Sequence, residues 1–333
     1  MRILRRICTA TMPILVAITV LPVAAQNPDG GAPPAYPAKP VRIITGGPGT
    51  LPDIITRRLG QHLTRSWGQS VVVDNRGGAG LVIGTGAAAR AAPDGYTLLV
   101  SDRTALAAAP AAYKEPPYNS SRDFAPITLI SRSPALLVVH PSVPVKAVRE
   151  LIDYARKYPG KLTYSAAGPV TGNHIAGEMF KQATGVDLML IQYKGGAAAM
   201  LAVVSGEVAT TFSTLPVALP VVAAGKVKAL AIASGKRYSG LPDIPTVAEA
   251  GVPGFEADNW NGLLAPARTP PEIIAKVNRD AVAVLRDPEV RKSFFEHGSE
   301  IMAGTPEDFA RFIITETERM KRVIDAAGIR VSQ

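Results

Sequence analysis

Residues 162–179 read LTYSAAGPVTGNHIAGEM, and this stretch carries the pattern that decides the fold class. It begins with Leu162 to Tyr164, a short apolar run typical of a buried strand. It ends with Ile175 and Met179, which are four positions apart and so share a helix face. Between them lies a glycine- and hydroxyl-rich turn, Ser165 to His174. A strand, a small-residue turn and a helix in this order predict one unit of an α/β sheet.

The same alternation runs along the chain from Pro40. We expect strands at the apolar runs 41–44, 71–73, 96–100, 127–130, 135–139, 162–164, 188–191, 208–212 and 229–233. Helical spacing separates most of these runs, and the chain ends in two helical segments, Ile273 to Leu285 and Phe309 to Ile324. This rhythm indicates an α/β protein. About 300 residues exceed one typical core, so two lobes are expected.

The first 25 residues have the order of a secretory signal peptide. Three arginines precede an apolar run from Met12 to Val20, and small residues follow up to Ala25. The run is shorter than the roughly 20 residues needed to cross a bilayer, so cleavage near Ala25 is favoured over a membrane anchor. A proline- and glycine-rich leader is predicted for residues 26–39, and the mature protein is expected to be exported and soluble.

Composition excludes several classes of function. The single cysteine, Cys8, lies in the signal peptide, so the mature chain has no disulfide, thiol nucleophile or thiolate metal site. Loss of the three arginines lowers the formal charge from +9 to +6, and a mild positive field favours anionic solutes. The basic residues are scattered and only 6% of the chain is aromatic, which argues against nucleic acid as a partner.

No catalytic, metal or cofactor motif is recognisable. The four histidines, His62, His140, His174 and His297, lack the close spacing of metal ligands, and no G-x-S-x-G elbow occurs. His174 with Ser165 could form a base and nucleophile, but one histidine at a helix start is more often a cap or core contact. We therefore expect no catalytic residues, no cofactor and no metal.

Two glycine-rich turns after early strands could contact a ligand, because ligands of open α/β sheets bind at the carboxyl ends of strands. In the turn Thr45 to Asp53, Thr50 and Asp53 either form a helix capping box or face the ligand, while the N–H groups of residues 46–50 could hold a carboxylate. In the turn Asn75 to Gly80, Arg76 could clamp a carboxylate, but an arginine there more often ties down its own loop.

Two later turns complete the candidates. Ser165 to His174 offers neutral donors at a helix N-terminus, which carries a partial positive charge. In the turn Gln192 to Ala197, Tyr193 could cover an apolar part of a solute, and Lys194 could pair with an anion or point outward.

Several ordered motifs carry a family resemblance. They are VVVDNRGGAG at 71–80, APDGYTLL at 92–99, DFAPI at 123–127, YPGKL at 158–162, YKGG at 193–196, LPDIPTVAEAG at 241–251 and LAP at 264–266. With them, the chain from about Pro40 to Ile329 resembles the extracytoplasmic receptors of tripartite tricarboxylate transporters, also called the Bug family.

The resemblance implies a periplasmic binding protein fold of the second type, in which two lobes, each a mixed sheet flanked by helices, enclose a ligand cleft. Lobe 1 would comprise 40–138 with 259–333 and lobe 2 would comprise 139–258, with crossings near Val139 and Asp258. The expected protein is a monomer that binds a small carboxylate and delivers it to the transporter. The expected carboxylate is an organic acid, with an aromatic acid and a dicarboxylic acid both left open. The matching ligand-binding residues are Gly47, Gly49, Thr50, Asp53, Ser165, Ala166, Gly168, Thr171, His174, Tyr193, Gly195, Gly196 and Ala197.

The first loop departs from the family pattern. Gly46 stands where the family usually has phenylalanine, Thr50 replaces an expected glycine, and Pro52 removes an N–H donor before Asp53. An acid common in the strand 208–212 is also absent, which removes one partner for an amine. Two alternatives remain open: a sensor that feeds a signalling kinase, and an exported hydrolase or isomerase that uses the same cleft.

Overall fold

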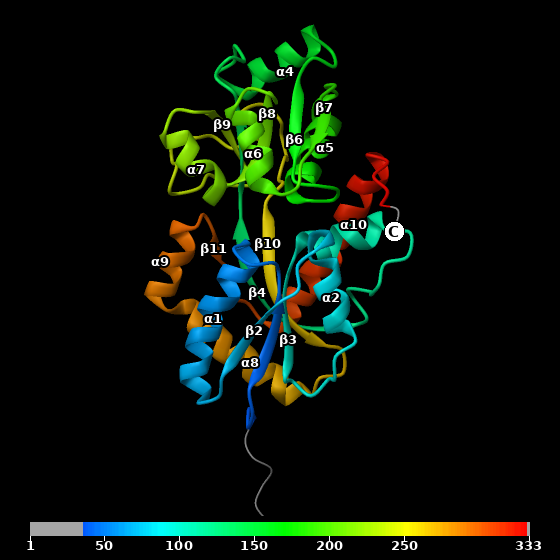
Figure 1. Ribbon diagram of the computed structural model, residues 1–333, viewed down its shortest axis with the longest axis vertical. Coiled ribbons are helices and arrows are strands. Elements are labelled where there is room, and N and C mark those ends of the chain that lie inside the picture. The colour runs from blue at the N-terminus through cyan, green and yellow to red at the C-terminus, as the bar shows by residue number, and fades with distance from the viewer. Residues whose placement is uncertain (1–35, 332–333) are drawn as a thin grey trace, which may run out of the picture. The chain divides into compact units, whose positions relative to one another are not determined.

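The computed structural model describes residues 36–331, so the predicted signal peptide and most of the predicted leader lie outside the described residues. Two β-sheets with helices packed on them form the framework (Figure 1). Both sheets are mixed, and the predicted two-lobed α/β fold is confirmed.

The first sheet contains β1 (Val41–Thr45), β2 (Val71–Asn75), β3 (Thr97–Asp102), β4 (Phe124–Ser133), β10 (Asn259–Pro266) and β11 (Glu300–Ile301). Its order is β11-β4-β10-β3-β1-β2. The second sheet contains β5 (Ala135–Val139), β6 (Thr163–Ala166), β7 (Met189–Gln192), β8 (Thr210–Thr214) and β9 (Lys228–Ala233), in the order β7-β6-β8-β5-β9.

Helices follow most strands. Those of the first lobe are α1 (Leu51–Trp67), η1 (Ala79–Leu81), α2 (Val82–Ala89), η2 (Thr104–Ala108), α3 (Ala109–Ala112), α8 (Pro271–Arg286), α9 (Pro288–Glu296) and α10 (Pro306–Ala326). Those of the second are α4 (Val148–Lys157), α5 (Gly172–Thr184), α6 (Gly196–Val204) and α7 (Leu215–Ala223). Within residues 36–331, no helix combines the length and apolar character that a membrane span requires.

The chain passes between the sheets twice, from β4 to β5 and from β9 to β10. The first crossing was expected near Val139, but β5, which ends there, already pairs with β8 and β9, so the crossing lies at Pro134. All five residues of β5 are buried, and a wholly apolar run does not reveal to which sheet it belongs. β10 begins at Asn259, next to the second expected crossing.

The two crossing segments are tied together by an ion pair. Arg132 donates from Nε and Nη2 to the two carboxylate oxygens of Asp258, at 2.5 and 3.0 Å. This pair borders a cavity of about 300 Å³, the rear cavity, which Lys236 and Glu300 also line. Neighbours of the ion pair, Ser133 and Asn259, border a different cavity, because successive side chains of a strand point to opposite faces.

The end of the predicted leader belongs to the fold. Tyr36 packs against Trp67 and Tyr96, with ring centroids 6.2 and 5.2 Å apart, and its hydroxyl donates to the carbonyl of Gly95 at 2.7 Å. The expected start near Pro40 is therefore too late. Prolines and glycines dominate this stretch, and its one aromatic residue supplies the apolar surface that holds it to the lobe.

The core beneath β10 is built around aromatic side chains. Trp260 is fully buried and packs edge-to-face on Phe309 and Phe312 of α10, at 5.9 and 5.3 Å between ring centroids. Its indole N–H donates to Glu316 at 3.1 Å. Gly262 lies under the ring of Phe309, where a Cβ would come within 2.0 Å of a ring carbon, so the close approach requires glycine.

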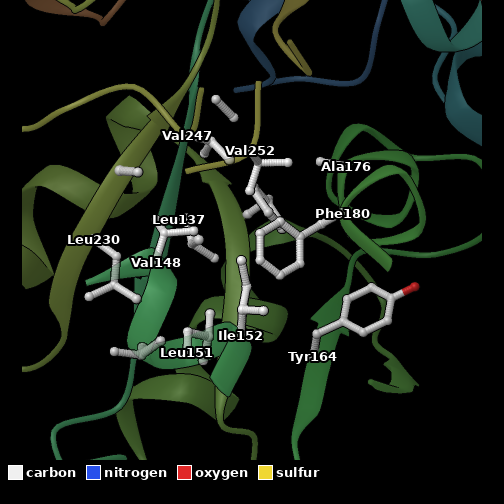
Figure 2. Packing of buried hydrophobic residues seen from close by; sticks show 14 of the residues in the cluster. Leu137, Val148, Leu151, Ile152, Tyr164, Ala176, Phe180, Leu230, Val247 and Val252 are labelled. Atoms are coloured by element: carbon white, nitrogen blue, oxygen red, sulfur yellow. The ribbon is translucent and has the colours of Figure 1, made fainter. Parts of the chain in front are cut away.

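The second lobe has its own apolar core (Figure 2). Phe180 of α5, Phe212 of β8 and Phe255 meet with ring centroids 5.8 to 6.0 Å apart. Tyr164 borders this cluster, and its hydroxyl points away from it to donate to Glu178. The ring of Tyr164 lies over Gly177, so β6 and α5 pack closely enough to fix the loop between them.

A threonine stands before each of two C-terminal helices, and the two threonines have different roles. Thr305 Oγ1 accepts from the N–H of Asp308 at 3.1 Å and so caps α10. At α8, Pro270 occupies the cap position, and the Thr269 hydroxyl donates back to the carbonyl of Pro266 at 2.8 Å. A second proline before the acid shifts the helix start by one residue.

Candidate functional site

A cavity of about 280 Å³, the front cavity, lies between the two sheets. It is found at the carboxyl ends of β1, β3, β6, β7 and β8, where open α/β sheets bind ligands. Its lining residues are Thr50, Leu51, Pro52, Gly80, Asp102, Arg103, Thr104, Ser133, Ala135, Ala167, Thr171, Gly172, Asn173, Gly196, Ser213, Thr214, Val217, Ala257 and Asn259.

Four helices of at least nine residues begin at this cavity. The first turns of α1, α5, α6 and α7 contribute lining residues, and none of these helices is capped by the side chain of its own cap residue. The first N–H groups of a helix lack partners within the helix, and the helix dipole places partial positive charge there. The four N-termini together make the front cavity favourable for an anion.

Arg103 adds a full positive charge to the cavity lining. Arg103 comes directly after β3 in the sequence and is only 1% exposed. Its Nη1 donates to the main-chain carbonyl of Asp258 at 2.7 Å, whereas its Nη2 is buried without a hydrogen-bond partner. A Cβ built on Gly172 would lie 3.7 Å from Nη2, so this nitrogen lies beside the start of α5 in the other lobe.

Asp102 is the neighbouring acid. Its Oδ1 accepts from the N–H of Ala105 at 3.0 Å, which caps the start of η2. Burial raises the pKa of the Asp102 carboxyl above its ordinary value, although hydrogen bonds from Ala105 and Asn259 and the charge of Arg103 oppose this shift. The carboxyl therefore combines a structural role with a position on the cavity wall.

Three of the predicted ligand-binding residues, Thr50, Thr171 and Gly196, lie on the cavity lining and come from both lobes. The others lie in the same loops but outside the lining. They are Gly47, Gly49, Asp53, Ser165, Ala166, Gly168, His174, Tyr193, Gly195 and Ala197.

The loop from Thr45 to Asp53 is held by hydrogen bonds among its own residues. The Thr50 N–H and hydroxyl both donate to the carbonyl of Gly47, at 3.2 and 2.7 Å. The N–H of Gly49 donates to Asp53, which is 3% exposed and also accepts from Asn75 and Arg57. The N–H groups of Gly49 and Thr50, which were expected to be available to a carboxylate, are thus occupied.

Asp53 is expected to support stability and not ligand contact. Burial alone would raise its pKa, but hydrogen bonds from Asn75, Arg57 and Gly49 lower it below the ordinary value. We predict that Asp53→Ala lowers the free energy of unfolding by about 1–3 kcal/mol at pH 7, because Asn75, Arg57 and Gly49 lose the buried carboxylate that accepts their hydrogen bonds. A lowered pKa stabilises the fold above the unfolded-state pKa, so the difference should shrink as the pH falls.

Urea unfolding at several pH values measures this effect. Asp243→Ala, at an exposed acid, is the matched control and should stay within about 0.5 kcal/mol of the parent protein. A pH-independent loss in Asp53→Ala would contradict the assignment.

The loop after β6 is also internally bonded. The buried Ser165 hydroxyl donates to the carbonyl of Ala199 at 2.8 Å. His174 Nδ1 accepts from the N–H of Val170 at 3.1 Å, and burial lowers the pKa of His174 below its ordinary value. Thr171 donates to the carbonyl of Gly168 at 2.7 Å. Ser165 and His174 therefore have separate structural partners and do not form a nucleophile and base.

Two other candidates are engaged outside the cavity. The Tyr193 hydroxyl donates to Glu207 at 2.8 Å. Arg76 donates to Asp74 at 2.9 Å, as the structural interpretation of that arginine predicted. Within residues 36–331, no group of His, Cys, Asp and Glu residues is arranged to hold a metal ion.

Sequence reasoning missed the residues contributed by β3, the crossing segments and β8, above all Asp102, Arg103, Ser133, Ser213 and Asn259. A signal for two of them was present, because Ser101-Asp102-Arg103-Thr104 is a polar stretch directly after an apolar strand. No comparable sequence pattern marks Ser133 and Asn259, because they belong to the crossing segments and not to a polar turn after a strand.

Two mixed sheets joined by two crossing segments, with a cavity at the strand ends between them, define the class of two-lobed solute-binding proteins. The chain belongs to the tripartite tricarboxylate transporter family receptors, whose family model matches residues 55–329. Among curated relatives, protein BugT of Bordetella pertussis is 35% identical over 298 residues, which cover 89% of this chain and 91% of BugT.

Solved structures of similar proteins cover nearly the whole described chain. The R. palustris protein Rpa4515 with adipate is 34% identical with a TM-score of 0.81, covering 89% of this chain and 99% of that chain. The periplasmic binding protein BugD is 33% identical with a TM-score of 0.78 and the same coverage. MatC of Rhodopseudomonas palustris with bound malate is 29% identical with a TM-score of 0.77, covering 87% and 100%.

Proposed function

We propose that this protein is an exported receptor that captures a small carboxylate in the front cavity and delivers it to a membrane transporter of the tripartite tricarboxylate type. The observation that carries the proposal is the convergence of four uncapped helix N-termini on one cavity that is also lined by the buried Arg103. The adipate and malate bound by two similar proteins support the same ligand class.

In this proposal the protein acts in the periplasm as a monomer, and the two lobes close on the solute. The ligand must make contacts in the closed state that it lacks in the open state, because a ligand that binds both states equally shifts nothing. Thr50 and Thr171 belong to different lobes and line the same cavity, so a solute between them would meet both lobes only when they are closed.

We also propose that binding occurs without catalysis. The lining residues of the front cavity include serines and threonines but no histidine, cysteine or lysine to act as a base or nucleophile. Departure of the solute from the opened cleft would then complete the cycle.

A thermal-shift screen of the mature, ligand-stripped protein tests the proposal. The panel contains mono-, di- and tricarboxylates, aromatic acids and amino acids, with the uncharged amide of each acid as its control. A carboxylate at 100-fold excess over its Kd should stabilise the protein by about 2.7 kcal/mol and so raise the Tm. The matched amides should have no effect, and equal shifts with acids and amides would overturn the proposal.

A further inference from the structure

Among the lining residues of the front cavity, only Arg103 and Asp102 have ionisable side chains. The remaining lining residues are apolar, glycine or neutral polar. The negative charge that a carboxylate brings into the cavity must therefore be balanced by Arg103 and by the helix N-termini, whereas Asp102 opposes it.

Acids near Arg103 are all engaged with other groups. Asp258 is held by Arg132 through two hydrogen bonds, and Glu316 pairs with Arg319 at 3.0 Å and accepts from Trp260. Asp102 accepts from the N–H of Ala105 at the start of η2. Arg103 thus has no carboxylate bound to it within the described residues, although it is almost completely buried.

The position of the free nitrogen matters as much as its charge. Buried polar groups are nearly always hydrogen-bonded, and an orphaned charged donor is costly. Arg103 Nη2 is such a donor, and it lies beside Gly172 at the uncapped start of α5. A carboxylate that reaches this point would accept from the guanidinium while the helix dipole also stabilises it.

We propose that Arg103 is the residue that binds the ligand carboxylate and that, with Asp102 beside it, the cavity selects a solute with one carboxylate over a solute with two. This inference rests on the proposed function and specifies how many carboxylates the solute carries. One carboxylate balances the positive charge of Arg103. A second carboxylate finds no second cation on the lining and lies in the same small cavity as Asp102, and like charges at close range repel.

Isothermal titration calorimetry at pH 7.5 with two matched pairs of acids tests the inference. Hexanoate is compared with adipate, and benzoate with terephthalate, so that each pair differs by one carboxylate. In at least one pair the monoacid should bind about ten-fold more tightly than the diacid, and in neither pair should the diacid be preferred.

Three variants assign the effect to the two residues. Arg103→Gln should weaken binding of the monoacid about 30-fold or more, because it removes the buried charge that pairs with the carboxylate. Arg103→Lys should give an intermediate loss, since an ammonium keeps the charge but cannot also keep the fork geometry. Asp102→Asn should raise the affinity for the diacid and reduce the preference within each pair.

Circular dichroism and urea unfolding show which variants are folded. If Arg103→Gln does not fold, Arg103→Lys and Asp102→Asn still decide the matter, because they retain a cation and a capping side chain respectively. Unchanged affinity in the folded Arg103 variants, a diacid preferred by the parent protein, or binding of neither monoacid overturns the inference. The proposed function fails separately, when no acid in the wider thermal-shift panel stabilises the protein.

Discussion

Thr171→Tyr is expected to weaken carboxylate binding about 100-fold, a loss of ~2.7 kcal/mol, while the protein stays folded. Thr171 lines the front cavity at the start of α5, and a phenol ring there would fill much of a space of about 280 Å³. Its hydroxyl bonds to Gly168 and Asn173 and not to the helix N–H groups, so removing it should cost stability only about 1 kcal/mol. Calorimetry with the acid found by the thermal-shift screen measures the loss.

Thr315→Tyr is the matched control for this variant. Thr315 is exposed on α10 and lies outside the front cavity, so the same substitution there should leave the affinity unchanged. Equal affinities of Thr171→Tyr and the parent protein would place the ligand elsewhere.

The largest effect on stability is expected for Trp260→Ala. Removal of this fully buried indole leaves a cavity between β10 and α10 and takes away a hydrogen bond to the buried Glu316. Substitutions of this kind cost about 3–5 kcal/mol. Urea unfolding followed by far-UV circular dichroism should therefore show a clearly lower midpoint.

Trp67→Ala is the internal comparison, because Trp67 is the only other tryptophan of the chain. Trp67 is half-buried at the end of α1 and donates to Asp280 at 2.8 Å. Its loss should cost about 1–2 kcal/mol, as expected for a partly exposed group with one hydrogen bond. If the two variants were equally stable, the assignment of Trp260 to the centre of the core would be wrong.

The fold was predictable because most of its strands and helices have a recognisable local pattern of apolar residues. Runs such as Leu162 to Tyr164 and helical stripes such as Phe309 to Ile324 recur at the spacing of an α/β protein, and the structure has β6 and α10 there. The crossing was misplaced because Ala135–Val139 is apolar at every position and Pro134 alone separates it from β4. Strand partners depend on contacts distant in sequence, which periodicity does not encode.

The candidate site was predictable only as a set of loops. The turns after β1, β6 and β7 do supply Thr50, Thr171 and Gly196 to the front cavity. The sequence does not show which polar atoms form hydrogen bonds within the protein and are therefore not available to a ligand. Asp53 and Ser165 were predicted to bind the ligand, but each forms hydrogen bonds to other protein atoms. Arg103 was missed because a single arginine after a strand gains meaning only from its burial and its unpaired nitrogen.

The alternation of side chains along the crossing segments has a mechanical consequence. Ser133 and Asn259 border the front cavity, while their neighbours Arg132 and Asp258 border the rear cavity of about 300 Å³. The same crossing segments form the common wall of both cavities, and the Arg132–Asp258 ion pair joins these segments. A rearrangement of this ion pair would therefore change the wall of both cavities together.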